Sequence, residues 1–397
     1  MSGGKPAIAG VAELPPTRDP GDATAMDYIL RVARDAMADA ALTPKDVDGV
    51  LVAPTFGGAP VTVSSMVADY LTVRPAYCDV VDLGGATAAG MVWRAAAAVE
   101  LGQADAVLVV MPGSTEVPRS EAKPGRTLSW FGASSNNYGS PQAEFEIPYG
   151  NVGQNGPYAQ IAQRYAHEFG YDAAALARIA VQQRENACAH PGAVFHGKPI
   201  TVDDVLDSPV IADPIHMLET VMRVQGGAGV LIANADVAQR ARHRPVWIKG
   251  FGEHIRFKTP TYADDLIRTP IARAAERAFA MAGLQRSDID MASIYDCYTI
   301  TVLMTLEDAG FCGKGEGMAW LTEHDLTFRG DFPVNTAGGQ LSFGQAGMAG
   351  GMHHVVDGAR QVMGRSADAQ VTDCNIAFVT GNGGIMSEQV ALIMGGD

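Results

Sequence analysis

Two glycine-rich turns hold the residues of this chain whose types and spacing best suit chemistry. One is Gly84-Gly85-Ala86-Thr87, and the other extends from Gly338 to Gly351; each leads into a run with helical character. Dense glycine permits positive φ and close approach of the backbone to a ligand. The N-terminus of a helix also presents free N–H groups to a negative charge. Each turn is therefore either a site that stabilises an anion or a place where helices pack closely.

The spacing of apolar residues predicts the elements that position these turns. Short continuous apolar runs indicate buried strands, and helical periodicity indicates helices. Predicted strands cover residues 8–11, 49–53, 106–110, 230–233, 246–250, 291–294 and 375–379. Predicted helices cover residues 24–41, 91–101, 156–169, 173–188, 270–282 and 352–363, with a short element at 201–206. Strands alternate with helices, so the expected class is α/β.

The order of these elements repeats within the chain. From residue 245 the strand–helix–strand pattern of residues 8–53 begins again, and each copy continues with a glycine turn, a helix and a strand. Such a repeat predicts an internal duplication, with one half at 1–244 and the other at 245–397. The first half also contains an insertion at about 114–200, whose start is rich in Gly, Pro and aromatic residues and suits a pocket cover. Turns at the carboxyl ends of strands in such sheets converge on one crevice.

Bulk composition argues against several classes of function. The chain has 397 residues and a formal net charge of −15, with 44 acidic against 29 basic residues. This charge disfavours a surface for nucleic acid or anionic membranes. The five cysteines are odd in number and form no CxxC pair, so the sequence predicts neither a disulfide framework nor a metal site. No apolar run is long enough for a signal peptide or a membrane span, and we expect a soluble cytoplasmic protein.

Four short motifs give the chain a family resemblance. They are Tyr295-Asp296-Cys297-Tyr298, Asn335-Thr336-Ala337-Gly338-Gly339, Gly381-Asn382-Gly383-Gly384, and the run from Leu306 to Gly317. With the duplicated layout, they make nearly the whole chain resemble the thiolase superfamily of the sterol-carrier-protein type. Within that superfamily it most resembles the steroid side-chain-cleaving aldolases, which lack the catalytic cysteine. The resemblance implies an α/β thiolase fold of five layers, αβαβα, with two pseudo-symmetric halves.

The same resemblance implies a substrate class and partners. The substrate is expected as a coenzyme A thioester, without a tightly bound cofactor. A homodimer core and a small partner subunit with zinc-ribbon and OB-fold parts are implied as well. None of these follows from this chain's own residues.

The catalytic residues of thiolases are absent at the matching positions. Gly85 stands where thiolases place the nucleophilic cysteine, Gln345 where they place the histidine of a Gly-His-Pro motif, and Thr380 near their second cysteine. A thioester Claisen reaction needs a nucleophile, a base and a second proton carrier. The N–H groups near Gly85 and Gly384 remain as an expected oxyanion hole, in which each donor contributes about 3 kcal/mol to stabilising an enolate.

An enolate formed without an acyl-enzyme points to aldol chemistry. We therefore expect a retro-aldolase, a carbon–carbon lyase that cleaves a β-hydroxyacyl-CoA to a ketone or aldehyde and a shorter acyl-CoA. Tyr295 is the expected proton-transfer residue, because its motif position is where thiolases have an active-site Asn or His. A carboxylate beside it, Asp296, raises a tyrosine pKa and favours Tyr295 as a proton donor over Tyr295 as a base.

Other residues are expected around this tyrosine. The related aldolases have a second tyrosine at the position of Gln345, so a water held by Gln345 is expected to substitute for it. Tyr298 is a candidate second donor, or else a packing aromatic. Asp296 and His353 are candidates for substrate contact, and His353 suits packing equally well. The aromatic residues between 114 and 156 leave room for a steroid or aryl group.

Two other functions fit the same residues. The chain could be an acyltransferase or thiolase that uses Thr87, Cys297 or a partner's residue as nucleophile. It could also be a non-catalytic subunit that binds acyl-CoA or lipid. Detection of an acyl adduct would favour the first, and acyl-CoA binding without activity in every reconstituted complex would favour the second.

Overall fold

The two halves of the chain build one continuous sheet in the computed structural model, which describes residues 4–19, 21–55, 62–113, 144–151 and 153–397. Its nine strands follow the order β10-β12-β13-β9-β1-β8-β4-β2-β3. The first half supplies β1 (Ala7–Glu13), β2 (Gly49–Val52), β3 (Tyr77–Val80), β4 (Ala106–Pro112) and β8 (Gly227–Ala233). The second half supplies β9 (Val246–Ile255), β10 (Met291–Ser293), β12 (Ile376–Gly383) and β13 (Glu388–Gly395).

The duplication is visible in the pairing of these strands. In the first half β1 pairs antiparallel with β8, β8 antiparallel with β4, and β4 parallel with β2. In the second half β9, β13, β12 and β10 pair in the same order and directions. The halves join where β1 meets β9, through Ala7 opposite Trp247 and Ile8 opposite Val246. The predicted α/β class with two pseudo-symmetric halves is confirmed.

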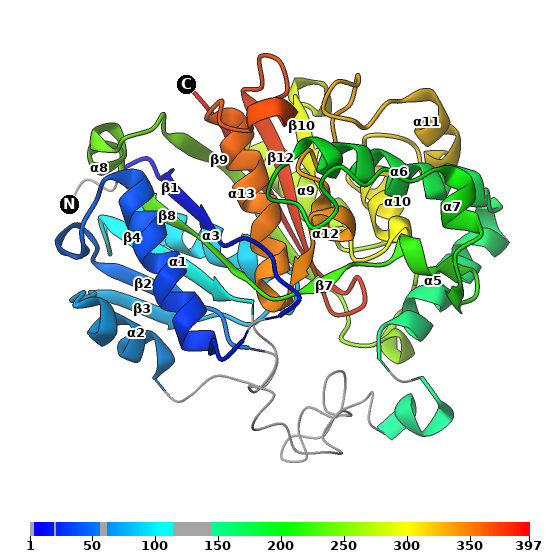
Figure 1. Cartoon of the computed structure of the whole chain (residues 1–397), viewed down its shortest axis with the longest axis horizontal. Helices are drawn as coiled ribbons and strands as arrows, with labels where there is room; N and C mark the ends of the chain where they lie inside the picture. The colour runs from blue at the N-terminus through cyan, green and yellow to red at the C-terminus, as the bar shows by residue number, and fades with distance from the viewer. Residues whose placement is uncertain (1–3, 20, 56–61, 114–143, 152) are drawn as a thin grey trace.

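Helices lie between the two halves of the sheet and cover both outer faces (Figure 1). α3 (Thr87–Glu100) and α13 (Gly350–Val362) share one buried core with strands of both halves and form the central layer. α1 (Ala25–Ala40) and α2 (Val63–Leu71) pack on the outer face of the first half. α9 (Ile271–Ala282) packs on the outer face of the second. This is the expected five-layer αβαβα arrangement.

Small residues allow the two central helices to approach each other. The first turn of α3 is Thr87-Ala88-Ala89-Gly90, all of it buried. α13 begins with two glycines, and a Cβ on Gly351 would lie 2.7 Å from the Gly85 carbonyl oxygen. Larger side chains here would force the helix starts apart. The local sequence therefore brings the first glycine turn against the end of the second.

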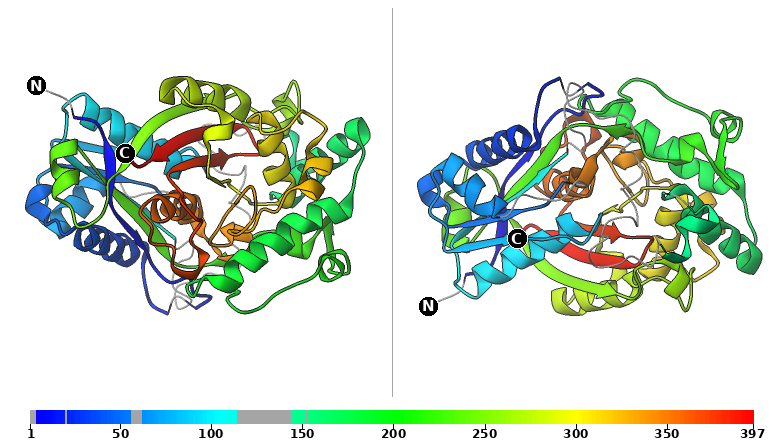
Figure 2. Two further views of the ribbon diagram at one scale, coloured as in Figure 1. Left: turned by 90° about the horizontal axis from the view of Figure 1, so that it is seen from above. Right: turned by 90° about the horizontal axis from the view of Figure 1, so that it is seen from below.

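The remaining elements lie around these layers. α5 (Asn155–Phe169), α6 (Ala173–Ala189) and α7 (Val202–Leu206) lie at the end of the molecule away from α1 (Figure 2). The other elements are α8 (Ala235–Arg240), α10 (Thr299–Asp308), α11 (Gly317–Glu323), α12 (Gly339–Ser342), β5 (Val210–Ala212), β6 (Ile215–His216), β7 (Arg223–Val224) and β11 (Gln345–Ala346). Of the predicted insertion at about 114–200, residues 114–143 and 152 lie outside the described residues.

The motif from Leu306 to Gly317 has a structural role. Glu307 is buried and accepts the Tyr165 hydroxyl as well as the N–H groups of Gly315 and Gly317, the latter two at 3.1 and 2.9 Å. Lys314 Nζ lies 3.2 Å from the other carboxylate oxygen. These contacts stabilise the conformation of the segment between α10 and α11.

The five cysteines are all free thiols. In the described part of the chain, no cluster of three or more His, Cys, Asp or Glu side chains has the geometry of a metal site. None of the helices in those same ranges combines the length and apolar composition that a membrane span requires.

Candidate active site

The first glycine turn lies directly against the loop that follows β12. Gly84 and Gly384 both have positive φ, +57° and +60°. A Cβ on Gly84 would lie 3.3 Å from the Gly384 nitrogen, and one on Gly383 would collide with the Leu83 carbonyl oxygen. Among the described residues, the Gly384 N–H has no backbone hydrogen-bond acceptor. The structure thus brings Gly384 next to the turn that carries Gly85.

The Tyr295 side chain occupies the space beside Gly85. A Cβ on Gly85 would lie 2.5 Å from Tyr295 Cζ, and it would collide with the Tyr295 hydroxyl and the Asn382 carbonyl oxygen. No cysteine or other side chain can stand at position 85 while Tyr295 keeps this position. The glycine at position 85 and the tyrosine at position 295 are therefore two parts of one arrangement.

Tyr295 is fixed by its backbone and buried by its surroundings. Its N–H donates to Thr380 Oγ1 at 3.0 Å, and only 8% of the residue is exposed. Burial, followed by the charges of Cys297 and Asp296, raises the Tyr295 pKa well above its ordinary value of 10, whereas the Gln340 side chain lowers it. The phenol is consequently protonated at neutral pH and suited to donate a proton. Thr380 thus holds the backbone of this tyrosine.

The Asp296 side chain contacts α12 and His354. Its carboxylate is fully buried and accepts the N–H groups of Gln340 and Leu341 at 2.8 and 3.1 Å. It also pairs with His354 Nε2 at 3.1 Å. A Cβ on Gly339 would collide with the same carboxylate, which explains the glycine at the start of α12. Because both oxygens hold α12, the contacts give Asp296 a positioning role, and the substrate contact expected from sequence stays a prediction.

Tyr298 belongs to a buried polar cluster that sequence reasoning missed. Its hydroxyl donates to Asn155 Oδ1 at 2.6 Å, and its ring stacks on Tyr158 with the centroids 4.3 Å apart. The Tyr158 hydroxyl accepts from Asn382 Nδ2 at 3.1 Å and lies 3.5 Å from the Gly384 carbonyl oxygen. α5 therefore supports the loop that carries Gly384. The sequence signals for this cluster are Tyr298 in the motif that begins at Tyr295 and Asn382 in the closing glycine motif.

Gln345 lies on the second glycine turn, where it is half-buried. Its Nε2 donates to the Gly347 carbonyl oxygen at 3.0 Å, and its backbone N–H donates to the Met222 carbonyl oxygen at 2.7 Å. The parallel pairing of β11 with β7 fixes this stretch. A Cβ on Gly350 would lie 2.9 Å from Gln345 Cγ, so Gln345 stands beside the start of α13.

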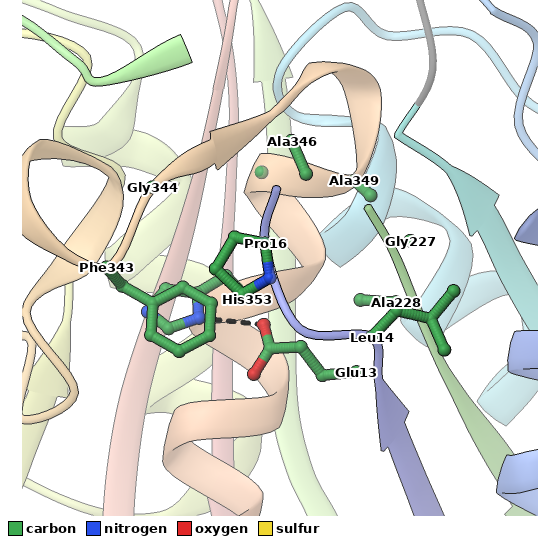
Figure 3. A pocket seen from close by; sticks show the side chains of 11 residues that line it. Glu13, Leu14, Pro16, Gly227, Ala228, Phe343, Gly344, Ala346, Ala349 and His353 are labelled. Carbon is green, nitrogen blue, oxygen red and sulfur yellow. Dashed lines mark hydrogen bonds and ion pairs between the residues drawn. The ribbon is translucent and has the colours of Figure 1, made fainter. Parts of the chain in front are cut away.

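His353 faces a small cavity on the β1 side of α13 (Figure 3). Its Nδ1 lies 2.8 Å from Glu13 Oε1, and its ring stacks on Phe343 with the centroids 4.1 Å apart. The cavity lining includes neither Gly85 nor Tyr295. The contacts of His353 therefore link β1 to the second glycine turn, and the substrate contact that the sequence suggests stays a prediction.

The Glu13–His353 pair predicts a pH-dependent contribution to stability. Burial lowers the His353 pKa, but Glu13 outweighs this effect and the net pKa lies above its ordinary value of 6.5. For Glu13, burial is outweighed by His353 and Arg360, so its pKa lies below 4.5. The stabilisation is lost as pH rises through the raised His353 pKa, and also as pH falls through the lowered Glu13 pKa. It is fully present between pH 4.5 and 6.5.

Glu13→Gln should accordingly lower the free energy of unfolding by about 2 kcal/mol within that window, because it removes a hydrogen bond between charged groups. The difference from the wild type should shrink at pH 8 and above. Thermal unfolding across pH measures this change. Glu168→Gln, which removes an exposed partner of Arg164, is the matched control and should have little effect at any pH. A Glu13→Gln effect that does not vary with pH would contradict the assignment.

Thr87 and Cys297 are poorly placed for nucleophilic catalysis. Thr87 is fully buried, and its Oγ1 accepts the Leu83 N–H at 2.8 Å. Burial raises the pKa of the Cys297 thiol to about 12, so very little thiolate forms at neutral pH. Neither residue has the activated state that acyl transfer requires.

Comparisons with known proteins agree with the motifs and the fold. Residues 252–396 match the model of the thiolase C-terminal domain-like family. A steroid side-chain-cleaving aldolase of Thermomonospora curvata is 30% identical to this chain, over 99% of this chain and 98% of the relative. The chain belongs to the thiolase superfamily. Its resemblance to the steroid side-chain-cleaving aldolases of that superfamily is confirmed.

Two further proteins support this placement within the thiolase superfamily. A 17-hydroxy-3-oxo-4-pregnene-20-carboxyl-CoA lyase of Mycobacterium tuberculosis is 29% identical over 96% of this chain and 98% of the relative. The solved structure of the Ltp2-ChsH2(DUF35) aldolase is 30% identical and has a TM-score of 0.88. That comparison covers 100% of this chain and 99% of the aldolase chain. Relatives named as aldolase or lyase thus match this thiolase superfamily member over almost its whole length.

Proposed function

We propose that this chain is a retro-aldolase that cleaves a β-hydroxyacyl-CoA to a ketone or aldehyde and a shorter acyl-CoA. The observation that carries the proposal is the Tyr295 phenol in the space beside Gly85. A thiolase needs a nucleophilic side chain in that space, whereas an aldolase needs a proton donor next to the enolate. The protonated state of Tyr295 at neutral pH suits the second requirement.

In the proposed reaction the thioester oxygen lies between the N–H groups near Gly85 and Gly384. A water held by Gln345 takes the proton of the β-hydroxyl group, the C–O bond becomes a carbonyl, and the Cα–Cβ bond breaks. The electron pair of that bond forms the enolate of the shorter acyl-CoA, which the N–H donors stabilise. Tyr295 gives its proton to Cα, and the phenolate then regains the proton that the water removed. No other reactant is consumed.

The substrate proposal rests on the names of the relatives. One relative is named for cleavage of steroid side chains, and another for cleavage of a pregnene carboxyl-CoA. We infer that this chain also acts on a CoA thioester whose acyl part carries a steroid or another large ring system. The reaction as written needs no tightly bound cofactor.

We further propose that the active form is a homodimer core with a small partner subunit built from zinc-ribbon and OB-fold parts. The combined name of the Ltp2-ChsH2(DUF35) aldolase supports a partner. β3 is one of the two outermost strands of the sheet, and Cys78, Asp79 and Val80 on it are exposed. Such an edge is suited to pairing with the same strand of a second copy. The free thiols support a cytoplasmic location.

A substrate panel tests the proposed function. The purified chain, alone and with its partner, should release a carbonyl product and a shorter acyl-CoA from β-hydroxyacyl-CoA thioesters. Cys297→Ala should leave the rate nearly unchanged, because Cys297 forms no intermediate. Mass spectrometry of the protein during turnover should detect no acyl adduct. Thiol-dependent cleavage of 3-ketoacyl-CoA with an acyl adduct would overturn the proposal in favour of a thiolase, and binding without turnover would favour a non-catalytic subunit.

A further inference from the structure

A fully buried histidine on α13 contacts the segment that carries Tyr295 on both sides of that tyrosine. His354 Nδ1 lies 3.0 Å from Ser293 Oγ, and its Nε2 lies 3.1 Å from Asp296 Oδ1. A buried imidazole is costly unless its nitrogens are hydrogen-bonded. Because carboxylate oxygens only accept hydrogen bonds, Nε2 carries the proton that faces Asp296, while Ser293 Oγ, which can donate or accept, pairs with Nδ1. One imidazole therefore bridges the residues on either side of Tyr295.

The main chain between these two contacts is held by other side chains. Asn335 Oδ1 accepts the Ile294 N–H at 2.7 Å, and Asn335 Nδ2 donates to the Ile294 carbonyl oxygen at 2.9 Å. The Tyr295 N–H donates to Thr380 at 3.0 Å. These bonds fix the backbone of Ile294 and Tyr295 and involve no atom of the Tyr295 ring. The ring depends on contacts from another element.

The face of α13 that carries His354 supplies contacts with the ring. The ring centroids of His354 and Tyr295 are 5.8 Å apart. Gly351 lies three residues before His354, on the same face of the helix, and a Cβ there would lie 3.4 Å from Tyr295 Cε2. The Ser293 hydroxyl also donates to Asp357 at 3.4 Å, three residues after His354. One face of α13 thus contacts both the Tyr295 ring and the residues beside it.

We propose that His354 is a positioning residue for Tyr295: its two ring nitrogens hold the residues on either side of the tyrosine and so keep the phenol hydroxyl beside Gly85. The inference rests on the proposed function, in which that hydroxyl gives its proton to Cα of the substrate. A displacement of about 1 Å in a catalytic group can lower a rate about 10²-fold. His354 itself transfers no proton in this reaction.

Two variants that each keep one of the ring-nitrogen contacts test this role. His354→Gln places an amide near the position of Nε2, and His354→Asn places one near the position of Nδ1, so each variant holds only one side of Tyr295. Both should lower kcat roughly 10- to 100-fold with little change in KM. His243→Asn, which changes a histidine paired with Asp39, is the control and should retain full activity. Lower thermal stability with unchanged kcat in both His354 variants would overturn the inference, because it indicates a packing role.

A double variant distinguishes positioning of the hydroxyl from a general effect on the site. When Tyr295→Phe has removed the hydroxyl, His354 has no proton donor left to position. His354→Asn combined with Tyr295→Phe should therefore have the same kcat as Tyr295→Phe alone. A further 10- to 100-fold loss in the double variant would mean that the two effects are independent, and the inference would then be wrong.

Crystal structures give a readout that does not depend on turnover. The Tyr295 hydroxyl should move roughly 0.5 Å or more from its wild-type position beside Gly85 in His354→Asn, which exceeds the tolerance of a catalytic group. It should stay in place in His243→Asn. Such a displacement, in a protein whose wild type cleaves no β-hydroxyacyl-CoA, would refute the proposed function and keep the positioning role. A Tyr295 hydroxyl at its wild-type position in both His354 variants would refute the positioning role.

Discussion

Replacing Tyr295 with phenylalanine is expected to lower kcat for cleavage by about 10³-fold, within the range for loss of a general acid. The variant keeps the ring that fills the space beside Gly85 and loses only the hydroxyl group. KM should change little, because the N–H donors near Gly85 and Gly384 stay in place. Chromatography of the released acyl-CoA measures both constants. Below pH 10 the wild-type rate should show no decline from Tyr295, since burial holds its pKa above that value.

Tyr298→Phe is the matched control for this prediction. It also removes one buried hydroxyl, but that hydroxyl donates to Asn155 and its ring stacks on Tyr158. Its loss should cost about 1 kcal/mol of stability, as for an ordinary hydrogen bond, and should reduce kcat far less than the change at Tyr295. A larger loss of kcat in Tyr298→Phe than in Tyr295→Phe would mean that the two roles are reversed.

Adding a single methyl group at Gly85 is expected to reduce kcat/KM by at least about 10²-fold, because small displacements of catalytic groups have effects of this size. The new Cβ of Gly85→Ala would overlap the Tyr295 hydroxyl and the Asn382 carbonyl oxygen. The ring, the loop or both must move, which disturbs the proton donor and the loop that carries Gly384. Overpacking of this kind should also cost about 1–3 kcal/mol of stability. Steady-state kinetics and thermal unfolding measure the two effects.

Three further variants separate the collision with Tyr295 from the other effects of a side chain at position 85. Gly192→Ala adds the same methyl group where the nearest atom, His190 Cε1, is 3.2 Å away, and should leave activity nearly unchanged. Gly85→Ala combined with Tyr295→Ala should be inactive and should lose less stability than the sum of the losses in the two single variants, because one of the two collisions is absent in the double variant. Gly85→Cys should not create thiolase activity while Tyr295 is present. Full activity in Gly85→Ala would show that Tyr295 does not need the space beside Gly85.

Gly85 and the Tyr295 phenol act as one unit in the proposed reaction. We propose that the Tyr295 hydroxyl, beside Gly85, occupies the space in which a thiolase holds its acyl group. The phenol comes from the segment after β10, and its backbone is fixed by Thr380 on β12. Restoring a cysteine alone is therefore insufficient, because its space is filled from a distant part of the chain.

Much of the fold is predictable from the sequence because strand and helix signals are local. The predicted helix at 270–282 and strand at 246–250 correspond to α9 and β9, and their repetition of the first half reveals the duplication. α10 and β13 cannot be predicted in this way. α10 is buried from Thr299 to Glu307 and so shows no polar face. β13 is buried over nearly its whole length and lacks the alternation of a half-exposed strand.

The candidate site, like the fold, is only partly predictable from the sequence. Residue identity alone shows that Gly85 and Gln345 lack the chemistry of cysteine and histidine, and that Tyr295 is an available proton donor. Only the tertiary structure shows which residues each side chain contacts. Asp296 holds a turn 44 residues away, and His353 pairs with a glutamate 340 residues away. Sequence spacing fixes the face of an element on which a residue lies, but the partner on that face is set by packing between distant segments, and this packing puts Tyr295 beside Gly85.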